Sequence, residues 1–145
     1  MVSLIREAKL NSKITQRIRR YTNRALEILN INNKIVTIIF CNKSMITGIN
    51  EKYFNKPFPT NVISFPLNED KHLGEIYICV EVAKEEAKEW GVSLFFEIMY
   101  LIIHGLLHLI GYDHVNNKEE ERIMEEKEIF LVERLKLKKW RENDS

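Results

Sequence analysis

The order of segments along the chain predicts an α+β fold, with a small mixed four-stranded sheet packed by about five helices. Helical spacing and short β-branched runs alternate along the sequence, and two strand-like runs follow one another in the middle. The 145 residues suit one hydrophobic core. No repeat and no Gly-, Pro- or Ser-rich stretch separates two parts. We therefore expect a single domain spanning residues 1–145.

The expected strands are short runs rich in β-branched residues, and the expected helices repeat apolar residues at helical spacing. The strands are predicted at 2–6, 35–41, 62–65 and 75–80. The helices are predicted at 13–29, 43–54, 82–90 and 94–110, with a last one opening at Asn116 or Asn117. Ser44 and Ser93 are the expected caps of two helices, and Gly91 the expected left-handed end of another.

Composition and charge favour a globular domain without a strong overall field. The apolar fraction is 45%, the charged fraction is 30% and the net charge is +1, so attraction to nucleic acid must come from local patches. The first residues carry charges where a secretory signal needs an apolar stretch. The most apolar segment, 94–110, contains Glu97 and two histidines and is shorter than the ~20 residues of a membrane span. We expect a buried core helix there and no membrane partner.

The two cysteines, Cys41 and Cys79, both lie in apolar, strand-like runs. Cysteine in such a run behaves as a small buried hydrophobe. So few cysteines fit a reducing compartment such as the cytosol.

Three of the four histidines lie within HGLLHLIGYDH, residues 104–114. His104 and His108, four residues apart on a helix, share one face. Gly111 ends that helix, so His114 can return to the same point. Three histidine ligands leave one position open, which is the catalytic arrangement for zinc. We predict one zinc ion on a zincin-like site in the buried helix, although imidazole also suits other divalent transition metals. His72, in a polar run, is expected to be merely exposed.

The histidine spacing equals that of metzincin proteases, H-E-x-x-H-x-x-G-x-x-H, but Gly105 stands where those proteases carry their general base. Glycine accepts no proton, so a metzincin-like metallopeptidase is disfavoured while the metal geometry remains. A glycine also removes bulk beside the metal, which would leave room for a larger substrate. Asp113 is the residue expected to assist catalysis, by holding a histidine or the water at the metal. A turn-stabilising role for Asp113 stays open.

Three segments in order resemble the YbeY family of bacterial metal-dependent endoribonucleases: PTNVISFP at 59–66, LGEIYIC at 73–79 and HGLLHLIGYDH at 104–114. The resemblance implies a cytoplasmic protein that cleaves single-stranded RNA. It also implies maturation of the 3′ end of small-subunit ribosomal RNA, with the small ribosomal subunit as partner, and a part in ribosome quality control. Zinc on His104, His108 and His114 and a mixed sheet packed by helices follow from the same resemblance.

One position departs from the family pattern. In INEKYFNK, residues 49–56, Phe54 stands where the family usually carries an arginine, which would meet phosphate through two parallel hydrogen bonds. Phenylalanine offers no such donor, so Lys52 or Lys56 is expected to supply the charge. The departure also keeps open a non-catalytic ribosome-assembly factor whose metal only braces the fold.

RNA is expected to be held mainly by electrostatic attraction, with help from stacking. Thr60, Asn61 and Ser64 are predicted to line the substrate groove, or else to be bonded within a loop and strand edge. Phe54 and Phe58 either stack bases or pack. Two basic groups are expected to face RNA or simply solvent: Lys13, Arg17, Arg20 and Arg24 in the first, and Lys136, Lys138, Lys139 and Arg141 in the second.

Overall fold

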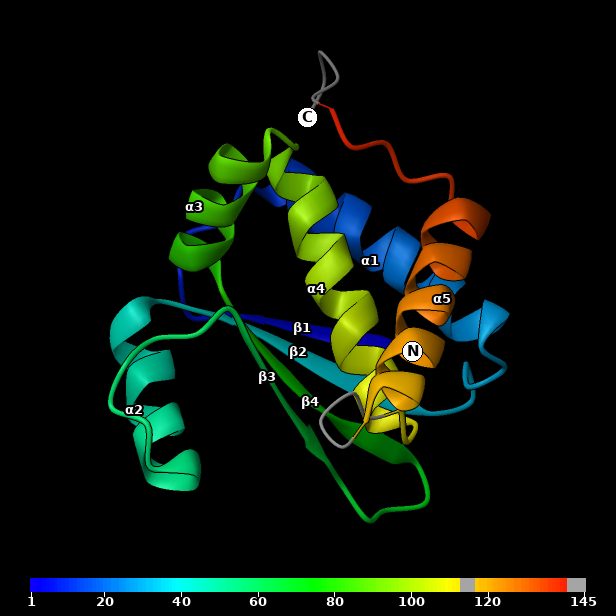
Figure 1. The fold of residues 1–145 in the computed structure, drawn as a ribbon, viewed down its shortest axis with the longest axis horizontal. Coiled ribbons are helices and arrows are strands. Elements are labelled where there is room, and N and C mark those ends of the chain that lie inside the picture. The colour runs from blue at the N-terminus through cyan, green and yellow to red at the C-terminus, as the bar shows by residue number, and fades with distance from the viewer. Residues whose placement is uncertain (113–116, 141–145) are drawn as a thin grey trace.

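The computed structural model describes residues 1–112 and 117–140 and places four strands and five helices within them (Figure 1). The strands are β1 (Val2–Arg6), β2 (Ile35–Cys41), β3 (Val62–Pro66) and β4 (His72–Cys79). The helices are α1 (Ser12–Ile28), α2 (Lys43–Phe54), α3 (Val80–Trp90), α4 (Leu94–Leu109) and α5 (Lys118–Arg134).

The four strands form one mixed sheet in the order β1-β2-β4-β3. β1 pairs in parallel with β2, and β2 pairs in parallel with β4. β3 runs antiparallel to β4, to which it is joined by a short hairpin connection. The expected α+β fold, with a mixed four-stranded sheet and five helices among the described residues, is confirmed.

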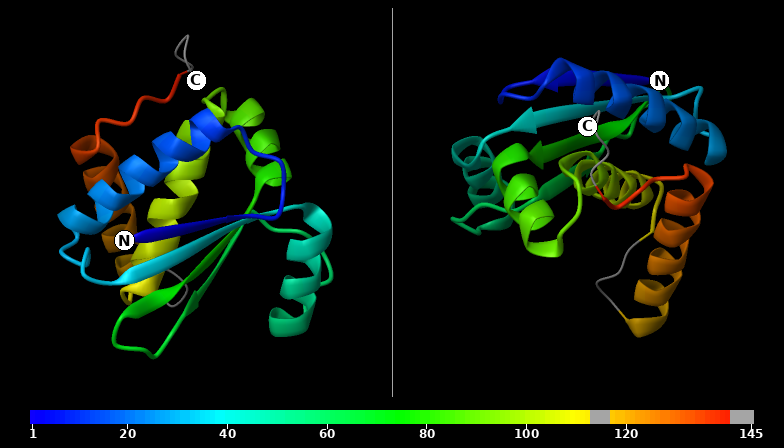
Figure 2. Two further views of the ribbon diagram at one scale, coloured as in Figure 1. Left: turned by 180° about the vertical axis from the view of Figure 1, so that it is seen from behind. Right: turned by 90° about the horizontal axis from the view of Figure 1, so that it is seen from above.

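The two faces of the sheet are covered unequally. Side chains alternate along β4, so Ile76 and Ile78 join the main core, while Cys79 belongs to a smaller cluster with Ile46 of α2. Figure 1 shows α2 on one side of the strands and the other four helices gathered on the opposite side, and Figure 2 shows the same grouping from behind and from above. The main core therefore lies on the side of the sheet that is covered by α1, α3, α4 and α5.

Helix α4 is the central element of that core and contacts β3, β4, α1, α3 and α5. Because it has neighbours on nearly every side, its sequence is apolar almost all round rather than on one stripe. Ser93 caps it by accepting a hydrogen bond from the Phe96 backbone N–H at 3.0 Å, and Gly111 follows it at φ +106°. Among the described residues, no single helix is long and apolar enough to cross a bilayer; α3 and α4 reach that length only together, bent by 114°.

Several local predictions hold, but the predicted cap of α2 and the predicted exposure of His72 are wrong. Gly91 has φ +68° at the end of α3, and the Asn117 side chain caps α5. The cap of α2, however, is Asn42, whose side chain accepts from the Met45 N–H at 2.9 Å. Ser44 is already the second residue of that helix, two residues beyond the cap position from which a side chain bonds the first free N–H groups.

His72 is the second correction, because it is partly buried rather than freely exposed. It begins β4, three residues earlier than expected, and its Nε2 lies 3.0 Å from the Thr37 hydroxyl on β2. Cys41 and Cys79 are buried free thiols, as expected. Burial raises the pKa of the Cys41 thiol to about 12.

Gly105 allows α4 to lie unusually close to the sheet. A Cβ at this position would stand 2.9 Å from Ile76 Cδ1 and 3.0 Å from Ser64 Oγ. Ile76 is fully buried in β4, so it has little room to move away. The glycine is therefore explained by helix–sheet packing, and the expectation that it clears room for substrate is corrected, since residue 105 faces the strands.

Comparing substitutions at Gly105 and Gly48 distinguishes the effect of packing on the free energy of unfolding from the effect of helix propensity. Gly105→Ala should lower the free energy of unfolding by about 1–2 kcal/mol, since overpacking outweighs the better propensity of alanine. Gly48→Ala in α2, where nothing lies within 4 Å of the added Cβ, should instead raise it by about 0.5–1 kcal/mol. Urea unfolding monitored by circular dichroism measures both, and equal effects of the two changes would contradict the close contact.

Candidate metal centre

His104 and His108 lie in the second half of α4 and point their Nε2 atoms at one another. The two Nε2 atoms are 3.1 Å apart, and the ring planes are inclined at 73°. Two imidazoles bound to one tetrahedral zinc ion at ~2.0–2.1 Å would hold their nitrogens ~3.3 Å apart. Between Leu101 and Leu109 all residues other than the two histidines are buried, so only these two side chains reach the surface. The pair therefore fits a metal ion at the rim of the core.

The remaining predicted ligand and the predicted catalytic residue fall outside the described part of the chain. These are His114 and Asp113, and both stay predictions. Within residues 1–112 and 117–140, no group of three His, Cys, Asp or Glu side chains is arranged to hold a metal. A third protein ligand, predicted from the sequence to be His114, would come from outside the described residues.

Glu128 of α5 is a buried carboxylate behind His104. Its Oε2 lies 3.5 Å from His104 Nδ1 and accepts no hydrogen bond from the described residues. Glu128 is only 4% exposed, and a buried negative charge is costly unless a cation compensates for it. A carboxylate behind a histidine is also the usual support of a metal-bound imidazole. The unsatisfied oxygen is thus a second observation that fits a divalent cation at the histidines.

Tyr100, one turn before His104 on α4, reaches the same carboxylate. Burial, together with the charge of Glu128 and a hydrogen bond to it, raises the pKa of Tyr100 to about 12, so the phenol stays protonated and can donate. Sequence reasoning missed both Glu128 and Tyr100. A signal existed for the first, because Met124, Glu128 and Leu131 follow helical spacing and all are buried, which places one acid in an apolar stripe.

A groove of about 490 Å³ opens in front of the two histidines. It brings together most of the predicted substrate-binding residues from the segment before β3 and from β3 itself. The groove is lined by the predicted residues Lys56, Thr60, Asn61 and Ser64 together with His104 and His108. Lys52 is not among them: it lies in a neighbouring groove, with its Nζ 5.3 Å from the Tyr53 ring centroid.

Phe54 also lines the histidine groove. Its ring stacks on Phe65 of β3, with centroids 6.1 Å apart and planes inclined by 15°, and the residue remains 47% exposed. At the position where the sequence resemblance implies an arginine, the structure therefore presents an aromatic face. Phe58 is exposed as well, and its carbonyl accepts a hydrogen bond from the Asn50 side chain.

Comparison with known proteins identifies the group to which the chain is related. The family model described as endoribonuclease YbeY matches residues 4–136. The chain belongs to this family. An endoribonuclease YbeY from Carboxydothermus hydrogenoformans is 44% identical over 108 residues, which are 72% of this chain and 75% of that protein. One from Syntrophus aciditrophicus is 37% identical over 143 residues, covering 91% of this chain and 89% of the relative.

A solved structure agrees with this assignment at the level of the fold. The solution structure of a Thermotoga maritima protein superimposes with a TM-score of 0.70 at 29% identity. The match covers 93% of this chain and 89% of that one. The YbeY-family chain thus shares its arrangement of elements with a solved structure over nearly its whole length.

One wall of the groove in this YbeY-family protein is tied to a pair of acids, of which Glu97 is buried and Glu86 is partly buried. The Asn61 side-chain amide donates to both oxygens of Glu86 on α3, each at 3.2 Å. Glu86 in turn bonds Glu97 of α4, which is 8% exposed. Burial, with the adjacent Glu86, raises the pKa of Glu97 to about 7. Asn61 therefore lines the groove and is also held in place by hydrogen bonds to Glu86. The sequence had offered a groove residue and a bonded loop residue as alternatives, and Asn61 is both.

Glu97 should make stability depend on pH. Its folded-state pKa lies above the ordinary value of 4.5, so stability falls as pH rises from about 4.5 to about 7. Glu97→Gln imitates the protonated acid and should be more stable than wild type by about 1–3 kcal/mol at pH 8, with little difference at pH 5. Urea unfolding at the two pH values measures this. The exposed Glu89→Gln on α3 is the control, and a Glu97→Gln difference that does not grow with pH would contradict the shift.

Proposed function

We propose that this chain is a metal-dependent endoribonuclease that cleaves single-stranded RNA. The observation that carries the proposal is the His104–His108 pair, with Nε2 atoms 3.1 Å apart, in the lining of an open groove. The names of the related proteins support the reaction class. Phosphodiester cleavage needs positive charge beside the reacting phosphate. Among the described groove residues, Lys56 is the lysine that can supply such charge, and the two histidines can hold a metal ion that supplies more.

Zinc is the proposed metal, held by His104, His108 and, from the sequence motif, His114. Neutral imidazoles suit zinc, and three protein ligands leave one position for water or substrate. When bound, such an ion supplies Lewis-acid charge to a phosphodiester oxygen and lowers the pKa of water. Asp113, next to His114 in the sequence, remains the proposed catalytic residue.

The buried Glu128 and the more exposed Tyr100 hold the His104 ring in one orientation. Glu128 favours a proton on His104 Nδ1, which directs the Nε2 lone pair toward the groove side as the proposed ligand atom. Tyr100 donates to the same carboxylate and holds it in place. In this proposal both residues are positioning residues that act through His104.

The groove residues favour a single strand over a duplex. Thr60 and Ser64 offer hydroxyl groups to the sugar–phosphate chain, and Lys56 offers charge. The exposed face of Phe54 can stack on an unpaired base, which a paired strand does not present. Stacking by Phe54 would thus replace part of the affinity that the missing arginine would have given.

The cellular role that we propose comes from the family resemblance of the three sequence motifs. It comprises maturation of the 3′ end of small-subunit ribosomal RNA and ribosome quality control, in the cytoplasm and with the small ribosomal subunit as partner. A metallopeptidase is disfavoured because residue 105 faces Ile76 and Ser64, so a glutamate there would not reach the groove without displacing the strands. A non-catalytic assembly factor is distinguished by complementation: His114→Ala should fail to support assembly if cleavage is required.

Cleavage should depend on the paired histidines. Wild type with zinc should cut a labelled single-stranded RNA, and His108→Ala should lose at least about a hundredfold in rate because a metal ligand is missing. His72→Ala, a histidine far along the chain on β4, is the matched control and should keep activity close to wild type. Gel analysis measures the rates, and elemental analysis of the same samples measures bound metal. Equal cutting by wild type and His108→Ala would sink the proposal.

Glu128 should strengthen metal binding. Glu128→Gln keeps the size and removes the charge, so zinc affinity should fall about ten- to a hundredfold. Glu133→Gln, an exposed change on the same helix, should leave the affinity unchanged. Competition with a chromophoric chelator measures both. Unaltered affinity of Glu128→Gln would show that the buried carboxylate has no part in the metal centre.

A further inference from the structure

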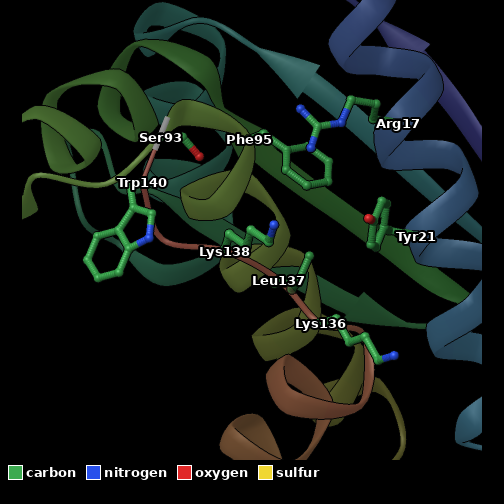
Figure 3. A pocket seen from close by; sticks show the side chains of 8 residues that line it. All are labelled: Arg17, Tyr21, Ser93, Phe95, Lys136, Leu137, Lys138 and Trp140. Atoms are coloured by element: carbon green, nitrogen blue, oxygen red, sulfur yellow. The ribbon is translucent and has the colours of Figure 1, made fainter. Parts of the chain in front are cut away.

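A second pocket lies at the other end of α4, between α1, the start of α4 and the segment that follows α5 (Figure 3). It encloses about 260 Å³. Its lining residues are Arg17 and Tyr21 of α1, Ser93 and Phe95 at the start of α4, and Lys136, Leu137, Lys138 and Trp140. Phe95 precedes His104 by nine residues on one helix, a rise of ~14 Å, so this pocket is separate from the metal centre.

The pocket concentrates positive charge in a chain whose net charge is only +1. Its described lining includes three cations, Arg17, Lys136 and Lys138, and no carboxylate. The Arg17 guanidinium lies 4.0 Å from the centroid of the Phe95 ring, and its buried Nη1 has no hydrogen-bond acceptor among the described residues. An arginine whose buried edge lacks an acceptor is a site where an incoming anion is favoured.

Backbone hydrogen bonds hold this arrangement in place. The segment after α5 turns at Lys136, which has φ +56°, and the Leu137 N–H donates to the Val132 carbonyl at 3.1 Å. Further along, the Ser93 N–H donates to the Lys139 carbonyl at 2.7 Å. The fold thus brings part of the first predicted basic group to part of the second. Arg20 and Lys139 are not among the pocket's lining residues, and Arg141 lies outside the described residues.

Aromatic rings form the rest of the pocket. Tyr21 meets Phe95 edge to face, with centroids 5.3 Å apart. Figure 3 shows the Arg17 guanidinium, the Lys138 amine and the Tyr21 hydroxyl directed toward the same space in front of Phe95. Trp140 stands at the edge with 70% of its surface exposed. A large exposed indole beside clustered cations combines the two features by which proteins hold unpaired nucleotides.

We propose that this pocket is a second binding site for single-stranded RNA. A phosphate lies against Arg17 and Lys138, Lys136 adds charge at the rim, and an adjoining base stacks on Trp140. The proposal rests on the proposed ribonuclease function, and it assigns to this pocket a stretch of RNA away from the scissile bond. Free phosphate would use the cations but not the indole, which is why a nucleotide strand is the favoured ligand.

Affinity is tested by fluorescence anisotropy of a labelled 12-nucleotide oligouridylate, in chelator so that cleavage does not interfere. Arg17→Gln, Lys136→Gln and Trp140→Leu should each weaken binding about tenfold, from lost charged contacts or lost stacking. The slope of log affinity against log salt should fall by ~0.7 for each lost phosphate contact. Arg19→Gln, an exposed arginine on the same helix but outside the pocket, is the matched control and should bind like wild type. Thermal unfolding of each variant verifies that it is folded.

The fluorescence of Trp140 also provides a direct measure of RNA binding at the pocket. The chain has two tryptophans, so Trp90→Phe leaves Trp140 as the sole indole, and oligouridylate should quench its fluorescence. Unchanged affinity in Arg17→Gln and Lys136→Gln would overturn the second site. Equal quenching by inorganic phosphate, with displacement of the RNA, would also overturn it in favour of a small-anion site. Absence of cleavage by zinc-loaded wild type, with this binding intact, would overturn the ribonuclease function alone.

Discussion

The close approach of α4 to the sheet at Gly105 is the contact on which the rest of the structure depends. With no side chain at this position, the helix backbone packs directly over Ile76 of β4 and Ser64 of β3. This fixes both the height and the rotation of the helix above the strands. His104, the preceding residue, is then turned about 100° from the sheet and faces the groove beside β3. A bulkier residue would lift the helix and separate the histidines from the groove residues that β3 supplies.

A second layer of the site comes from α5, which follows the last motif and packs on the outer side of α4. It contributes Glu128 to a position where the core otherwise takes apolar side chains. An acid there weakens the core unless its charge is matched, so its burial is best understood together with a cation at the histidines. If the proposed metal binds, packing and metal binding are coupled, because the carboxylate that costs stability without a cation would support a ligand once the ion is present.

The two ends of α4 present different chemistry. The C-terminal half carries the paired imidazoles at the open groove, and the N-terminal end forms part of the basic pocket with Arg17 and Lys138. Because one rigid helix joins them, a strand held at both places would be kept at a fixed distance and direction relative to the metal centre. Positioning of this kind raises the rate of a reaction without adding any group that takes part in it.

The sequence by itself determined the elements, the fold class and the paired histidines, because these follow from local periodicity and from spacing along one helix. It also placed Ser93 as a cap and started the last helix at Asn116 or Asn117, although it chose Ser44 where Asn42 caps α2. Only the tertiary structure decided which residues face one another. It assigned Gly105 to the sheet and Glu128 to His104, placed Lys52 outside the histidine groove, and brought Arg17 to Lys138. Those pairings join residues distant along the chain, and their geometry depends on how helices and strands pack, which no local pattern encodes.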